Sequence, residues 1–285
     1  MVSIVFDQMT EPKPTVTGPA DGRPVLSVVA PAHNEVENLE RLIGELEQAL
    51  TGIAFEVLIV DDASTDGSAE RVAELQKDRP WLRLISLSKP EGGGGNGQSV
   101  AFKVGFNAAR GELVGSLDAD LQNDPADFPR LIDEMQRTGA DFVQGDRSAA
   151  RRQGDAKIRQ VTSVIGRVFR RMILGDTIRD TGCSLRVMRR EIAVQLPLEY
   201  KGMHRFIPVT ARQLGYRVVE MPVAHRSRHA GEPKYGMGIT KRAIPGLMDC
   251  FAVRWMRSRR RADVTALERG VDAASPEPAA RGAEV

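Results

Sequence analysis

The segment that decides the fold reads LVGSLDADLQ, residues 113–122. Its first five residues form a short apolar run of the kind found in a fully buried strand. Asp118 and Asp120 follow at once, and in an extended chain they point the same way because side chains alternate between faces. A buried strand that ends in paired carboxylates indicates a parallel sheet with a ligand site at its carboxyl edge.

The paired carboxylates are candidate metal ligands. Two oxygen ligands on one face suit Mg²⁺ or Mn²⁺, and Gln122 is spaced to add a third oxygen. Acidic residues are also common in turns, so a solvated turn before Pro125 is the alternative interpretation. The buried strand in front of the acids favours the metal site.

Strand and helix signals alternate on both sides of this segment. Apolar runs predict strands, and apolar residues at helical spacing predict helices between them. The predicted strands are 25–30, 55–60, 82–87, 113–117 and 141–144, and the predicted helices are 36–50, 68–76, 98–109 and 126–137. This order predicts an α/β fold, with a mostly parallel sheet, right-handed crossovers and helices on both faces.

Polar clusters follow three more of the predicted strands. They are 33–35 (His-Asn-Glu), 61–62 (Asp-Asp) and 145–147 (Gly-Asp-Arg). Ligands of such sheets bind at the carboxyl ends of the strands, so these clusters are candidate binding residues. The alternative is helix capping, which we favour for Asp66 and keep open for Asn34 and Glu35.

After Arg147 the alternation stops and the chain becomes basic. Residues 147–171 hold eight Lys or Arg and one acid, and residues 241–261 hold seven and one. Helices are predicted over 157–174, 203–214 and 241–256, with a strand over 217–224. We interpret this half as a helical, basic lobe for an anionic acceptor, against the alternative of solvated helical faces.

Composition and the chain ends limit the class of protein. The net charge of +2 is too small to indicate a nucleic-acid binder, and Cys183 and Cys250 have neither metal nor disulfide spacing. No signal peptide and no apolar run of about 18 residues is seen. We predict a flexible leader (1–23), a catalytic domain (24–238), an amphipathic basic interfacial helix (239–261) and a disordered tail (262–285). Packing of that helix on the domain is the alternative to an interfacial position.

Four segments in order carry a family resemblance. They are 31–35 (PAHNE), 60–67 (VDDASTDG), 118–125 (DADLQNDP) and 179–186 (RDTGCSLR). The chain resembles the family 2 glycosyltransferases, and more narrowly the polyprenyl-phosphate glycosyltransferases of the dolichol-phosphate mannosyltransferase kind, from about residue 26 to 238. The resemblance implies a GT-A fold, which is a Rossmann-like sheet with an appended acceptor region.

The resemblance also implies roles for individual residues. The nucleotide sugar is assigned to Pro31, Asn34, Glu35, Asp62, Gly97, Asp118 and Lys234. The metal is assigned to Asp118, Asp120 and Gln122, and the acceptor phosphate to Arg147, Arg179 and Arg186. Asp118, Asp120, Arg147 and Arg179 are the expected catalytic residues. Pro233 departs from the family, which usually has Ser before the lysine of this loop.

These features predict an inverting, metal-dependent hexosyltransferase. The expected donor is GDP-mannose first and a UDP-hexose second, and the expected acceptor is a polyprenyl phosphate at the cytoplasmic face of a membrane. A phosphate nucleophile is anionic at neutral pH and needs no separate general base. Transfer to a glycan hydroxyl and a non-catalytic nucleotide binder are the alternatives. A dinucleotide site at Gly92, Gly94 and Gly97 is disfavoured, because these glycines follow the third strand rather than the first.

Overall fold

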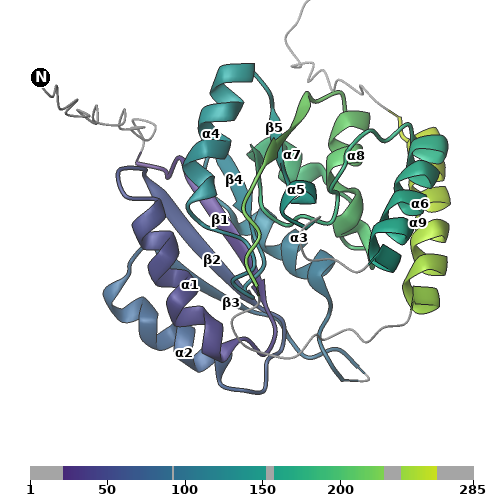
Figure 1. Ribbon diagram of the computed structural model, residues 1–285. Coiled ribbons are helices and arrows are strands. Elements are labelled where there is room, and N and C mark those ends of the chain that lie inside the picture. The colour runs from purple at the N-terminus through teal and green to yellow at the C-terminus, as the bar shows by residue number, and fades with distance from the viewer. Residues whose placement is uncertain (1–21, 92, 152–156, 228–238, 262–285) are drawn as a thin grey trace, which may run out of the picture.

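The computed structural model describes residues 22–91, 93–151, 157–227 and 239–261, which form a seven-stranded sheet covered by helices on both faces (Figure 1). The sheet order is β3-β2-β1-β4-β6-β5-β7. The strands are β1 (Leu26–Ala32), β2 (Phe55–Asp61), β3 (Leu82–Ser86), β4 (Leu113–Ser116), β5 (Phe142–Asp146), β6 (Arg186–Arg189) and β7 (Val218–Pro222). All neighbouring strands are parallel except β6, which is antiparallel to both β4 and β5. The predicted mostly parallel sheet is confirmed.

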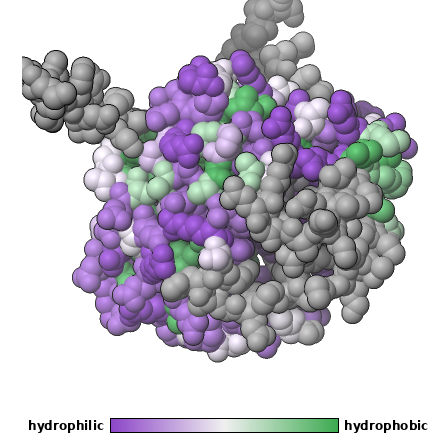
Figure 2. Space-filling model, in the orientation of Figure 1, coloured by the Kyte–Doolittle hydropathy of each residue, from purple (hydrophilic) through white to green (hydrophobic). Residues whose placement is uncertain are grey.

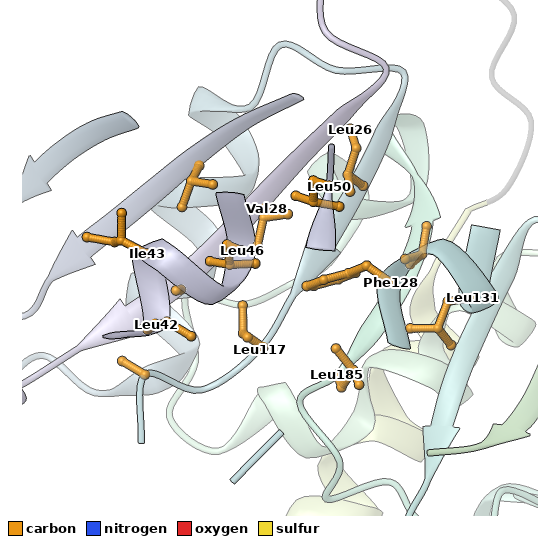
Figure 3. Close-up of a cluster of buried hydrophobic side chains, with 14 of the residues drawn as sticks. Leu26, Val28, Leu42, Ile43, Leu46, Leu50, Leu117, Phe128, Leu131 and Leu185 are labelled. Carbon is orange, nitrogen blue, oxygen red and sulfur yellow. The ribbon is translucent and has the colours of Figure 1, made fainter. Parts of the chain in front are cut away.

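Successive side chains of β1 point to opposite faces of the sheet, so the core has two layers, one on each face. Leu26 and Val28 face a cluster formed with α1 (Val36–Ala49), α2 (Ser68–Leu75) and α4 (Asp127–Thr138). Figure 3 shows side chains of α1, α4 and the strands pointing toward one another in this cluster. Val29 faces the opposite cluster, which contains Phe102 and Phe106 of α3 (Gln98–Ala108). Burial on both faces explains why these strands are continuous apolar runs.

The opposite cluster is completed by the second half of the chain. The helices of the second half are α5 (Ser148–Arg151), α6 (Lys157–Leu174), α7 (Arg190–Gln195), α8 (Ile207–Gln213) and α9 (Ile239–Arg259). The helix expected over 203–214 is a 3₁₀ turn, η2 (Met203–Phe206), followed by α8, with Pro208 in the first turn of α8. A second 3₁₀ turn, η1 (Gln76–Asp78), follows α2.

Three elements of the second half are not predicted by the sequence. They are α5, β6 and α7, of which β6 and α7 follow one another directly between residues 186 and 195. β6 lies between β4 and β5, so the second half contributes two strands to the central sheet as well as helices. β6 therefore places residues near 186 beside the end of β4, because Ser116 and Arg186 are register partners.

Helices α6 and α9 lie side by side at one edge of the molecule (Figure 1). Phe169 of α6 and Phe251 of α9 meet edge to face, with ring centroids 5.9 Å apart. Cys250 and Val253 of α9 are buried in the core. Among the described residues, no helix combines the length and apolar character needed to cross a bilayer. The predicted tail and residues 1–21 of the predicted leader lie outside the described residues.

Candidate active site

The carboxyl ends of β1 and β2 form the first part of the site. Asp62 N donates to Ala32 O at 2.8 Å, which continues the pairing of the two strands past their ends. The turns that follow are interlocked, since Asn34 N donates to Ser64 Oγ at 2.9 Å and Thr65 N donates to Asn34 Oδ1 at 2.8 Å. The predicted residues around Asn34 and Asp62 are thus brought together.

Asp66 holds the starts of two helices. Its Oδ1 accepts from Ser68 N at 3.0 Å at the start of α2, and its Oδ2 accepts from Val36 N at 3.1 Å at the start of α1. The N-cap residue of α2 is Gly67 rather than the predicted Asp66, although the Asp66 carboxylate accepts from a backbone N–H at each of the two helix starts. Glu35 accepts from Asn38 Nδ2 at 2.7 Å. Pro31 is the sixth residue of β1, paired in register with Val60. The donor-binding roles of Glu35 and Pro31 stay predictions.

The turns at this edge have a strained backbone. Among the described residues, three non-glycine residues have positive φ: Asn34 at 53°, Ala63 at 58° and Leu121 at 60°. Asn34 and Ala63 are the second residues after β1 and β2, and Leu121 is the fifth residue after β4, so all three lie in the loops at the carboxyl edge. Residues in the left-handed region cost free energy and persist where the surrounding structure fixes them, which is common at functional sites.

The two carboxylates after β4 lie close enough to affect each other. Asp120 is buried and Asp118 is partly buried. Burial, and then the neighbouring charge of Asp120, raise the pKa of Asp118 to about 6. A divalent cation fits this pair, because it would remove the repulsion between two carboxylates held in a poorly solvated place. Asp118 and Asp120 are therefore suited to hold Mg²⁺ or Mn²⁺.

The described residues form no complete protein cage for that cation. Among the described residues, no three His, Cys, Asp or Glu side chains converge as a metal site. Gln122 donates its backbone N–H to Asp120 Oδ1 at 3.2 Å, and its role as a third ligand stays a prediction. Two carboxylates fit a cation that takes its other ligands from water and phosphate oxygens.

The three predicted arginines lie in different surroundings. Arg147 is buried, and its guanidinium faces Asp180, with Nε 2.8 Å from Oδ2 and Nη2 3.1 Å from Oδ1. Arg186 is 2 % exposed and donates to the backbone oxygens of Ser184 and Cys183. Arg179 is exposed. The structure brings Arg147 and Arg186 to the side of Asp118, where their positive charges lower its pKa.

Arg186 is an unusual group for a protein interior. Its Nη1 is buried and has no hydrogen-bond partner among the described residues. Burial lowers the pKa of this guanidinium to about 10. A buried guanidinium with an unused donor fits a site built for an anion, since guanidinium groups bind phosphate oxygens in pairs.

His204 is a partly buried histidine close enough to Arg186 to be affected by its charge. Its Nδ1 lies 2.9 Å from Ser99 Oγ in the first turn of α3. Burial, then the charges of Arg205 and Arg186, lower the pKa of His204 to about 3. The ring is therefore neutral at physiological pH and a weak base. Lys234, a predicted donor-binding residue, lies outside the described residues.

Several site residues were missed from the sequence. Asp180 holds Arg147, Ser184 lowers the pKa of Asp118, and Gln98 donates from its side chain to Asp118 Oδ1. Asp180 and Ser184 lie inside the segment 179–186, so that segment was the available signal. Nothing in the local sequence marks Gln98, because its contact spans twenty residues.

This fold and site define a glycosyltransferase of the GT-A architecture. The model of the family described as Glycosyl transferase family 2 matches residues 27–196, more than half of the chain. The chain belongs to that family.

Curated relatives and a solved structure agree with this assignment. A dodecaprenyl-phosphate galacturonate synthase from Rhizobium johnstonii is 32% identical over 78% of this chain and 65% of its own length. An undecaprenyl-phosphate 4-deoxy-4-formamido-L-arabinose transferase from Edwardsiella ictaluri is 33% identical over 82% of this chain and 70% of its own length. The chain thus spans about two thirds of these relatives. A mannosyltransferase from Pyrobaculum calidifontis, solved with GDP-Man and Mn²⁺, shares the fold with a TM-score of 0.58 and 19% identity over 86% of this chain and 67% of that one.

Proposed function

We propose that the protein transfers a sugar from a nucleoside-diphosphate sugar to a polyprenyl phosphate, with inversion at the anomeric carbon. The observation that carries the proposal concerns two buried guanidinium groups. Those of Arg147 and Arg186 lie near enough to Asp118 for their charges to lower its pKa. A buried guanidinium with an open donor suits a phosphate acceptor better than a neutral hydroxyl acceptor. The names of the relatives, which contain a polyprenyl phosphate, support the same acceptor class.

The donor end of the site would hold the diphosphate at the carboxyl edge of β1, β2 and β4. Asp118 and Asp120 would hold Mg²⁺ or Mn²⁺, and a bound cation would neutralise charge on the leaving diphosphate. Pro31, Asn34, Glu35, Asp62 and Gly97, which follow or end β1, β2 and the loop before α3, are proposed to bind the nucleotide. GDP-mannose is the first donor to test and UDP-hexoses the second.

The described residues favour an acceptor that needs no general base. The pKa of His204 is about 3, so its ring is a poor proton acceptor. Asp118 is proposed to be occupied by the cation. A phosphate monoester is already anionic at neutral pH and can attack without losing a proton to the protein. Arg186 and Arg147 would orient that phosphate, and the exposed Arg179 is proposed to meet it at the surface.

A surface suited to a membrane lies on α6 and α9. Figure 2 shows apolar residues gathering at the edge where these helices lie. Large apolar side chains are exposed there: Val168, Met172, Met248, Phe251 and Trp255. Exposed arginines surround them: Arg171, Arg254, Arg257 and Arg259. An apolar face with tryptophan and basic flanks binds an anionic interface. We propose that the protein sits peripherally on the cytoplasmic face, with α9 bound to the domain on one side and to lipid on the other.

The proposed reaction is tested with the purified protein, Mn²⁺ and a panel of nucleotide sugars. Radiolabelled sugar should appear in the organic phase only when a polyprenyl phosphate is present. The same donors are offered with the dephosphorylated polyprenol and with free sugars. Label transferred to a free sugar hydroxyl, and none to the lipid phosphate, would replace this proposal with a glycan transferase. Donor binding without any transfer would indicate a nucleotide-binding protein.

A further inference from the structure

The segment from residue 93 to 98 connects the two acidic strand ends of the proposed donor site. It runs from the loop after β3 to the first residue of α3, and it contacts both Asp62, which follows β2, and Asp118, which follows β4. In the sheet, β1 lies between β2 and β4. The segment therefore spans the carboxyl edge of three neighbouring strands.

One end of the segment is fixed to Asp62. Its Oδ1 accepts from Asn96 N at 2.7 Å and from Asn96 Nδ2 at 3.0 Å, and its Oδ2 accepts from Gly97 N at 2.7 Å. A side chain at Gly95 is excluded, because a Cβ there would lie 2.5 Å from Asp62 Oδ2. Three donors to one carboxylate make the contact between the loop and Asp62 rigid.

The other end of the segment is fixed to Asp118. The amide Nε2 of Gln98 donates to Asp118 Oδ1. Gln98 is itself held, because it is the first residue of α3 and α3 packs tightly on the sheet. A Cβ at Gly105 of this helix would lie 2.3 Å from Val29 Cγ1. The amide thus approaches Asp118 from a rigid element.

This contact has a direct consequence for the metal ligands. Asp118 and Asp120 are one residue apart and repel each other, so in isolation Asp118 would turn away from Asp120. A donor on Oδ1 opposes that rotation, and a hydrogen bond with Ser184 holds the same carboxylate. Hydrogen bonds of this kind orient metal ligands, and their removal weakens metal binding.

We propose that Gln98 is a positioning residue of the donor site, which holds Asp118 in the orientation that binds the cation while its own loop holds Asp62. The proposal rests on the proposed function, because it assumes that Asp118 is a metal ligand. It assigns the glycine-rich segment a role in setting the spacing of the two donor-binding carboxylates.

The test is a titration of the protein with Mn²⁺, followed by the electron paramagnetic resonance signal of the free ion, with and without GDP or UDP. Gln98→Ala and Gln98→Met both remove the donor, and Met keeps the length of the side chain. Each should weaken Mn²⁺ binding about 10-fold. Gln76→Ala is the matched control. It also removes a glutamine amide donor, in this case to Leu82 O at 3.1 Å. That contact lies at β3, which β2 and β1 separate from β4 and Asp118.

A double-mutant cycle separates positioning from folding. In an Asp118→Asn background, Gln98→Ala should weaken Mn²⁺ binding no further, because its effect acts through Asp118. Unchanged Mn²⁺ affinity in Gln98→Ala and Gln98→Met overturns the proposal. A lowered melting temperature with unchanged Mn²⁺ affinity also overturns it, because the amide would then serve folding alone. A parent protein that binds neither Mn²⁺ nor nucleotide overturns the proposed function together with this inference.

Discussion

The guanidinium of Arg147 and the carboxylate of Asp180 form a buried two-point ion pair across 33 residues of sequence. The backbone N–H of Arg147 donates to the same carboxylate at 3.1 Å, so Asp180 fixes both the main chain and the side chain of Arg147. The pair ties the end of β5 to the segment before β6. It also holds a positive charge next to the proposed metal ligands.

Loss of Asp180 should destabilise the protein strongly. Asp180→Asn leaves the Arg147 charge buried without its partner, and breaking a buried pair in this way costs about 3–5 kcal/mol. Urea unfolding followed by circular dichroism measures the change. Arg137→Ala is the control, because its pair with Glu134 lies on the exposed surface of α4, and its midpoint should stay that of the parent. Equal midpoints for both variants would contradict the structural role of the pair.

Asp120→Asn should abolish metal-dependent turnover of the donor. The change keeps the size of the side chain and removes one of the two carboxylates that fit a divalent cation. Release of nucleoside diphosphate is measured with Mn²⁺, with Mg²⁺ and in chelator. Full turnover in chelator, or an active Asp120→Asn enzyme, would disprove the metal role.

Arg179→Ala should lose transfer to polyprenyl phosphate while donor binding stays near normal. Removing one guanidinium from a phosphate site is expected to cost about 2 kcal/mol or more, which is roughly 30-fold in transfer. Arg179 is exposed, so its removal tests binding with little effect on folding. Arg189→Ala is the matched control. Arg189 is also an exposed arginine, but it lies at the end of β6 away from Arg186 and is paired with Asp141. Equal transfer by both variants would remove Arg179 from the acceptor site.

Mn²⁺ affinity should fall as the pH is lowered through about 6. The pKa of Asp118 is raised to about 6, so below that pH a proton competes with the cation for this ligand. Calorimetric titrations with Mn²⁺ at pH 5 and pH 7.5 measure the effect, and Asp118→Asn should remove the pH dependence. The free energy of unfolding of the metal-free protein should change in the opposite direction and fall as the pH rises. The folded state binds this proton more tightly than the unfolded state, so in the metal-free protein this group contributes stability that is lost as the pH rises from about 4 to about 6.

Membrane binding should depend on the exposed face of α6 and α9. The double variant Met172→Glu/Trp255→Glu should lose sedimentation with anionic liposomes, because both side chains are more than half exposed and apolar. Added salt should also release the parent, since charges are screened over about 8 Å at physiological ionic strength. Arg137→Glu on α4 changes the net charge by the same amount without removing apolar surface. If it releases the protein as strongly, total charge rather than this face drives binding.

The sequence predicts the first half of the fold well for a physical reason. β1, β2 and β4 are mostly apolar because both faces of the sheet are covered, and α1 and α4 between the strands are amphipathic. β6 could not be predicted, since its four residues begin and end with arginine and it is stabilised by pairing with β4 and β5.

The candidate site divides in a similar way. Asp118 and Asp120 are visible in sequence because they directly follow a strand. The hydrogen bond from Gln98 to Asp118 and the pair of Arg147 with Asp180 depend on contacts between distant segments, which spacing alone does not reveal. The position of Lys234 relative to the donor site stays a prediction.

The sheet order also has a consequence for synthesis of the chain on the ribosome. β3, β2, β1 and β4 are neighbours, and all of them precede residue 117. β5 contacts only β6 and β7 within the described sheet, and both emerge later. The proposed nucleotide half can therefore assemble while the chain is still being made. β5 must wait for its neighbours in the sheet until about 40 more residues, to β6, have been translated. This interval is when a chaperone would be needed most.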